Sequence, residues 1–188
     1  QYGDNREAMP MIAVGTEKAP LSLSGRQQSA VCFNDPQTFR YRGDRNDPKR
    51  AELYQKLSLT APAKMTDNLD WVSQASVTAN EASGEVRRLA SSYKAKAEYP
   101  NTSLGRNMQV IAGLISGGLK TRVYWTSIGG FDTHRGQRQR HDLLMTQIND
   151  AIFAFQRDLT QQGKADRVLT LTMSEFGRRV QENGSEGT

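Results

Sequence analysis

The sequence lacks several features that would assign a protein to a class at once. Cys32 is the single cysteine among 188 residues, so no disulfide can form within the chain. No run of 18 apolar residues occurs, and we therefore predict no membrane-spanning helix. Histidine occurs only twice. What remains, with 36% hydrophobic and 24% charged residues, is typical of a globular chain that buries a core.

Other absences concern partners and catalysis. The net charge of +5 mildly favours an anionic partner, but no basic stripe interleaved with aromatic residues predicts nucleic-acid binding. A polyanion binder driven by net charge alone is an alternative that a steep salt dependence of binding would reveal. The chain has neither a Gly-x-Ser-x-Gly motif nor a phosphate-binding loop with Gly-Lys-Ser/Thr. No constellation for a nucleophile is therefore evident.

The first hundred residues predict irregular and helical structure with few strands. Short apolar runs predict strands at Met11–Val14 and Ala30–Phe33. Apolar residues spaced by three and four predict helices over residues 47–59, 67–96 and 104–119, with Asp47 and Ser103 as N-caps of the first and last.

The chain is predicted to be organised around the stretch from Thr121 to Arg178. This stretch is the main part of a predicted core unit over residues 103–178. Thr121–Ile128 and Val168–Met173 are rich in residues that favour strands, and a long amphipathic helix over 137–162 separates them. Such a strand–helix–strand unit forms a parallel pair with a right-handed crossover. The predicted fold class is α/β, and the loops after the two strands are expected at one edge of the sheet, where ligands bind.

Both histidines lie within ten residues of one aspartate in this unit. Asp132 and His134, two apart in the first loop, can converge on one ion, and His141 on the apolar stripe of the helix points back toward that loop. Aspartate and imidazole are normal ligands of zinc and other divalent metals. A metal site is one interpretation. The other is a capping aspartate, a surface histidine and a histidine packed in the core.

The second loop carries a carboxylate and a guanidinium. Glu175 could act as an acid or base or support a metal ligand, and Arg178 could hold an anion, although a buried ion pair between the two is an equal alternative. Gly129 and Gly130 end the first strand and allow either a tight turn or close approach of backbone to a ligand. Further arginines would suit phosphate or sulfate, or simply be solvated: Arg135, Arg138, Arg140 and Arg179.

Taken together, these motifs resemble a bacterial protein family. Gly129-Gly-Phe-Asp-Thr-His134, the helix opening near His141 and Val168-Leu-Thr-Leu-Thr-Met-Ser-Glu-Phe-Gly-Arg178 are similar to the domain of unknown function 1501 family (DUF1501), which is placed with alkaline-phosphatase-like and sulfatase-like hydrolases. Leu114–Val123 and Glu182–Thr188 are similar to it as well. The resemblance covers residues 103–188 well and the preceding residues loosely.

The resemblance implies a fold, an activity and a site. The fold would be an alkaline-phosphatase-like three-layer sandwich with a mostly parallel sheet, a single partial domain over residues 1–188. The activity would be metal-dependent hydrolysis of a small phosphate or sulfate ester, with zinc as the first choice of metal and manganese or calcium as others. Asp132 and His134 would be metal ligands, His141 would support them, and Glu175 and Arg178 would serve catalysis.

Family members continue past the equivalent of Thr188 with Asp-His-Gly, and carry an earlier glycine-rich strand end with an aspartate. The resemblance therefore implies an internal fragment, inactive by itself, of a protein exported through a twin-arginine signal. The alternative within the same fold is an exported protein that binds a metal or another ligand without catalysis.

Overall fold

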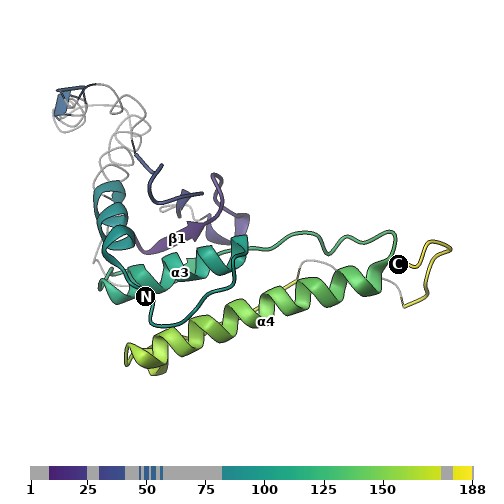
Figure 1. Cartoon of the computed structure of the whole chain (residues 1–188). Coiled ribbons are helices and arrows are strands. Elements are labelled where there is room, and N and C mark those ends of the chain that lie inside the picture. The colour runs from purple at the N-terminus through teal and green to yellow at the C-terminus, as the bar shows by residue number, and fades with distance from the viewer. Residues whose placement is uncertain are drawn as a thin grey trace, which may run out of the picture. The chain divides into compact units, whose positions relative to one another are not determined.

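The structure is a computed structural model, and it describes residues 9–24, 30–40, 47, 49–50, 52–53, 56, 82–174 and 180–187 (Figure 1). The chain forms two compact units. The first comprises residues 1–93 and 113–125, and the second comprises residues 94–112 and 126–188. No helix in these described ranges has both the length and the apolar character needed to cross a membrane.

A three-stranded parallel sheet forms the centre of the first unit. Its order is β2-β1-β3, with β1 (Met11–Val14) between β2 (Val31–Phe33) and β3 (Val123–Trp125). Ile12 is opposite Val31 on one side and Tyr124 on the other. The central strand is buried at residues 12–14, as expected for a parallel sheet whose two faces are covered. The two early strands predicted from the sequence are confirmed, and the mixed α/β class is confirmed with them.

The predicted strand Thr121–Ile128 forms, but over fewer residues. Pairing begins before β3 itself, because the amides of Arg122 and Val123 both donate to the Pro10 carbonyl. The Thr121 hydroxyl donates to the Met9 carbonyl over 2.7 Å. β3 then ends at Trp125, and residues 126–133 continue as a loop. A short helical turn, η1 (Leu21–Leu23), lies between β1 and β2 in the chain.

Helices of the first unit pack through small residues. Residues 82–92 are helical, with Ala82, Val86 and Leu89 buried. A methyl group added at Gly117 would lie within 2.9 Å of three Leu89 side-chain atoms. The predicted helix over 67–96 is therefore confirmed in part, ending at residue 92, while residues 67–81 lie outside the described residues.

Two predicted helix starts have different outcomes. Asp47 accepts a hydrogen bond from the Lys49 amide over 3.0 Å, which confirms it as an N-cap, although most of the helix expected to follow lies outside the described residues. Helix α3 (Ser103–Ser116) forms as predicted, but its cap is Thr102, whose hydroxyl accepts from the Gly105 amide over 3.0 Å. Ser103 is the first helical residue, so the predicted cap was one residue too late.

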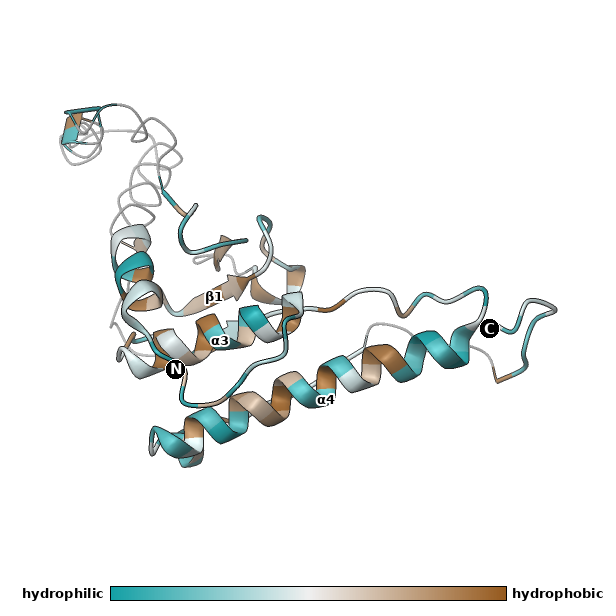
Figure 2. Ribbon diagram, viewed as in Figure 1, coloured by the Kyte–Doolittle hydropathy of each residue, from teal (hydrophilic) through white to brown (hydrophobic). Residues whose placement is uncertain are grey.

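Helix α4 (Gln137–Gln161) is the longest element of the second unit (Figure 1). Its predicted extent is confirmed, and Gly163, with φ of +69°, follows its end. The helix begins with hydrophilic turns, and apolar residues recur along the rest of it (Figure 2). Its buried residues lie in the second half: Ala151, Ala154, Phe155, Asp158 and Leu159. A short turn, η3 (Ala165–Arg167), comes next in the chain.

Asp158 joins the end of α4 to the segment that precedes α3. This aspartate is fully buried, and its carboxylate accepts from the Tyr99 hydroxyl over 2.9 Å and from the Lys96 amide over 3.2 Å. The Gln162 side-chain amide donates to it over 3.0 Å. These three donors compensate for burying a charge, so Asp158 is a structural group.

The predicted strand Val168–Met173 does not form. Residues 168–174 adopt no regular secondary structure, although Val168 has extended backbone angles. A strand requires a partner for its backbone groups, and no described residue supplies one here. Three apolar side chains of this segment are 80–86% exposed: Leu169, Leu171 and Met173. The strand–helix–strand prediction is therefore wrong for its second strand in this structure.

Candidate functional site

The candidate site lies in the loop that joins β3 to α4. Gly130 has φ of +99°, a conformation that favours glycine, and the loop turns there. A side chain added at Gly130 would contact the Arg140 guanidinium and Leu144 on α4. Gly136, also left-handed with φ of +55°, is the N-cap residue of α4. These two glycines frame the segment from Phe131 to Arg135, which carries the predicted ligands.

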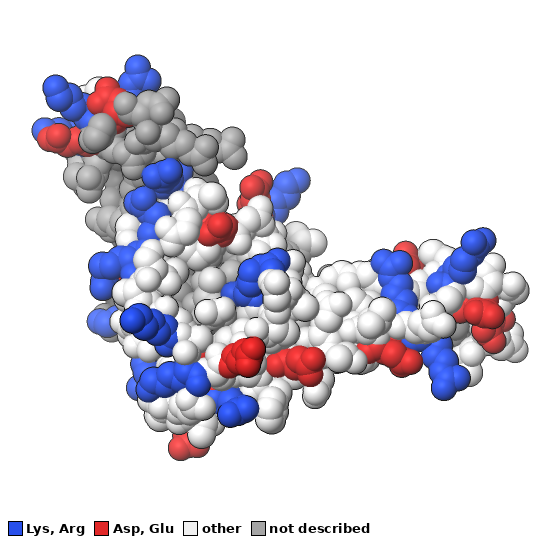
Figure 3. All heavy atoms as spheres, in the orientation of Figure 1, with Lys and Arg blue, Asp and Glu red and all other residues white. Residues whose placement is uncertain are grey.

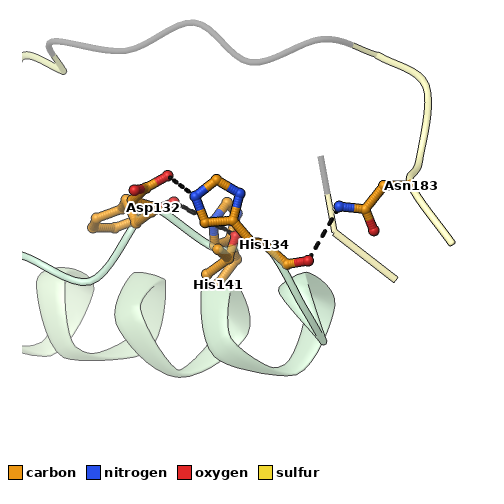
Figure 4. A network of polar contacts seen from close by, with 6 residues as sticks. Asp132, His134, His141 and Asn183 are labelled. Carbon is orange, nitrogen blue, oxygen red and sulfur yellow. Dashed lines mark hydrogen bonds and ion pairs between the residues drawn. The ribbon is translucent and has the colours of Figure 1, made fainter. Parts of the chain in front are cut away.

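Asp132 and His134 converge, as the sequence predicted. His134 Nε2 lies 3.3 Å from Asp132 Oδ1, and Figure 4 shows the two side chains facing each other above α4. Both side chains are open to solvent, with 59% of Asp132 and 74% of His134 exposed. A contact between two exposed side chains contributes little to stability.

His141 holds the loop instead of joining the pair. Its Nε2 lies 3.0 Å from the Thr133 hydroxyl and 3.2 Å from the Phe131 carbonyl oxygen, to which a protonated Nε2 donates. The ring also packs against Phe131, with 5.4 Å between ring centroids. Thr133 is itself only 2% exposed. His141 therefore ties the residues on either side of Asp132 to the first turns of α4.

Residues near the end of the chain reach the same loop. Asn183 Nδ2 donates to the His134 carbonyl oxygen over 3.1 Å (Figure 4). The Gly136 and Gln137 amides donate to the carbonyls of Ser185 and Glu186, respectively. The turn over residues 183–187 thus contacts both the loop that carries Asp132 and His134 and the start of α4.

The second predicted loop is outside the described residues, and Glu175 and Arg178 lie within it. Three arginines near the first loop have exposed side chains, as the solvated interpretation predicts: Arg135, Arg138 and Arg140. Around the start of α4, basic and acidic side chains are both visible at the surface (Figure 3). Within the described ranges, no three His, Cys, Asp or Glu side chains come close enough together to hold a metal ion.

Sequence reasoning missed the residues that position the pair. Asn183-Gly184 is a turn signal, but nothing in the pattern indicates that the turn contacts residues 49 positions earlier. The sequence pattern indicates no role for Thr133, and the burial of this residue cannot be inferred from a polar loop.

The fold and this loop define a mixed α/β protein with a parallel sheet and a paired carboxylate and imidazole in the loop that follows one strand. A sequence model of the family described as "Protein of unknown function (DUF1501)" matches residues 4–188, and the chain belongs to this family. No curated protein and no solved structure matches the chain.

Proposed function

We propose that the protein is a metal-dependent hydrolase of phosphate or sulfate esters, and that Asp132 and His134 bind the metal. The observation that carries this proposal is the convergence of these two side chains on the solvent side of the loop after β3. Each donates a lone pair from an atom that divalent metals prefer, an oxygen and an imidazole nitrogen.

The 3.3 Å spacing of the pair is that of a direct polar contact, and it also suits two ligands of one zinc ion. Two ligand atoms about 2.0–2.1 Å from a tetrahedral zinc ion lie roughly 3.3 Å apart. The observed separation of Asp132 Oδ1 and His134 Nε2 is 3.3 Å. A structural zinc site needs about four ligands and a catalytic one about three, so others must join the pair. By the family resemblance, an Asp-His pair after position 188 would supply them, and the turn over 183–187 contacts His134 directly.

A bound divalent metal would polarise an ester oxygen and lower the pKa of a coordinated water. The residues of this chain would then orient and bind the substrate. The exposed residues Arg135 and Arg138 precede and follow the first residue of α4, and their positive charge would favour an anionic ester. We assign Arg178 to anion binding and Glu175 to support of a ligand or to proton transfer, on the chemistry of a guanidinium and a carboxylate in the second predicted loop. Zinc is our first choice of metal, and manganese and calcium are alternatives.

The same proposal includes the detailed fold, an alkaline-phosphatase-like three-layer sandwich. An alkaline-phosphatase-like sandwich places a further layer over each face of its sheet, and the exposed apolar side chains at positions 169, 171 and 173 would be buried by such a layer. The resemblance also supports export from the cytoplasm through a twin-arginine signal.

The test is an assay of the full-length protein on aryl phosphates and aryl sulfates with added zinc, manganese or calcium. Asp132→Ala and His134→Ala should each reduce kcat/KM by about a hundredfold or more, because each removes a metal ligand. Asp150→Ala, which removes an exposed aspartate elsewhere on α4, is the matched control and should retain activity. Equal activity with and without the Asp132 and His134 side chains would end the catalytic proposal.

A second candidate function is metal binding without catalysis, because only Asp132 and His134 converge among the described residues. Asp132 and His134, completed by further ligands, would bind a metal without turnover, and the described residues show these two facing each other. The same protein would then be an exported binding protein. Bound metal in the intact protein, lost in both alanine variants, with no turnover of any ester, would favour this function.

A further inference from the structure

Residues 183–187 form a tight turn organised by one side chain. Asn183 Oδ1 accepts from the amides of Ser185 and Gly187, over 2.8 and 3.0 Å. The Asn183 amide donates to the Gly187 carbonyl over 2.6 Å and closes the turn from the other side. Glu186 has φ of +59°, which is unusual for a residue with a side chain. The shape of the turn therefore depends on Asn183.

The turn also completes the start of α4. This helix has Gly136 as its N-cap and no side-chain cap, so its first amides need other acceptors. The Gly136 amide donates to the Ser185 carbonyl over 3.1 Å, and the Gln137 amide donates to the Glu186 carbonyl over 2.8 Å. Two backbone carbonyls of the turn thus take the place of a capping side chain.

A third contact fixes the backbone of His134. Asn183 Nδ2 donates to the His134 carbonyl oxygen over 3.1 Å. Gly187 lies against the same peptide, because an added methyl group would be 2.4 Å from the His134 carbonyl carbon and 2.8 Å from the Arg135 nitrogen. These neighbours are backbone atoms, which cannot move aside as a flexible side chain could. Only glycine fits at position 187.

We propose that the turn over residues 183–187 is a clasp that sets the position of the His134 side chain relative to Asp132, with Asn183 and Gly187 as its positioning residues. The inference rests on the proposed metal-binding role of the pair. Groups that orient a metal ligand contribute to affinity without touching the metal, and their loss typically costs about 10–100-fold in affinity. The clasp acts on the backbone that carries the imidazole.

Two glycines of the turn provide a matched test. In the full-length protein, Gly187→Ala forces a methyl group into the His134 peptide, while at Gly184 the added methyl group meets no atom within 4 Å. We expect Gly187→Ala to weaken zinc binding, measured by calorimetry, by about tenfold or more, and Gly184→Ala to change it less than about twofold. Zinc affinities that are equal in the parent and in both variants would overturn the clasp.

A second variant separates the contact with His134 from the turn itself. Asn183→Asp keeps the oxygen that accepts from Ser185 and Gly187 but removes the Nδ2 donor that binds the His134 carbonyl. We expect it to weaken zinc binding about tenfold with an unchanged melting temperature. Ser185→Ala, whose side chain takes no part in these bonds, is its control. Parent-like affinity in Asn183→Asp would refute the role of that hydrogen bond.

A readout that needs no metal keeps the two proposals distinguishable. The nitrogen and proton NMR signals of the His134 imidazole, assigned by their loss in His134→Ala, report its contact with Asp132. If the parent binds none of zinc, manganese and calcium, the proposed function fails. The clasp is then supported if Gly187→Ala shifts these signals and Gly184→Ala does not, and it is overturned if neither variant shifts them.

Discussion

Two aspartates of the same unit show how differently a carboxylate can be used. Asp158 is fully buried and receives hydrogen bonds from Tyr99, the Lys96 amide and Gln162. Asp132 is 59% exposed and faces an imidazole 3.3 Å away. The buried carboxylate is surrounded by donors that leave no room for a ligand, whereas the exposed one can be reached by an ion from solvent. Accessibility to solvent, more than residue type, separates a structural group from a candidate ligand.

The largest expected effect is a difference in stability between variants of the two aspartates. Asp158→Ala should lower the free energy of unfolding by on the order of 2–4 kcal/mol, because three donors lose an acceptor that is itself fully buried. Asp132→Ala should change it by less than about 0.5 kcal/mol, since its ion pair is exposed. Urea unfolding of both variants measures the difference. Similar losses in the two would show that both carboxylates are structural.

An intermediate effect tests whether His141 positions the pair or binds metal itself. His141→Ala removes the contacts with Phe131 and Thr133 and should weaken zinc binding about tenfold, less than the loss from His134→Ala. Gln139→Ala, at an exposed position of the same helical turn, should have no effect. Calorimetric titration measures both. Complete loss of binding in His141→Ala, as in His134→Ala, would make His141 a ligand and contradict our assignment.

The smallest effect extends the comparison to a buried ionisable group of the other unit. Burial raises the pKa of Tyr124 on β3 to about 12, above the usual value near 10. Its contribution to stability is therefore fully present below pH about 10 and is lost as the pH rises toward 12. Tyr124→Phe should remove part of the alkaline loss of stability, seen in melting temperatures between pH 8 and 11. Parallel curves for the parent and the variant would contradict this.

Local patterns predicted those elements that depend mainly on local forces. Met11–Val14 formed its strand, and α4 covers nearly the predicted helix, because apolar spacing and a following glycine are local signals. The cap of α3 was misplaced by one residue, since Thr102 and Ser103 are equally good capping residues and only geometry chooses between them. Val168–Met173 has strand-forming residues, but pairing is a tertiary property and no described strand pairs with it.

Contacts within the loop after β3 were predicted only where they are local. Asp132 and His134 were expected to meet because side chains two residues apart in one loop can do so whatever the rest of the fold does. The packing of His141 against Phe131 agrees with the alternative of a packed histidine, but helical spacing could not show that its Nε2 lies beside the Phe131 carbonyl and the Thr133 hydroxyl. Asn183 and Asp158 were missed for the same reason: their partners lie 49 and 59 or more residues away.

The capping of α4 by backbone carbonyls from the turn over 183–187 also has a consequence for the order in which the chain folds. The acceptors of its first two amides come from residues 185 and 186, about fifty positions downstream. During synthesis on the ribosome, the helix would emerge well before those carbonyls are made, so its opening turn would stay frayed in the nascent chain. The imidazole of His134 would thus reach its final place only after translation has passed Gly187.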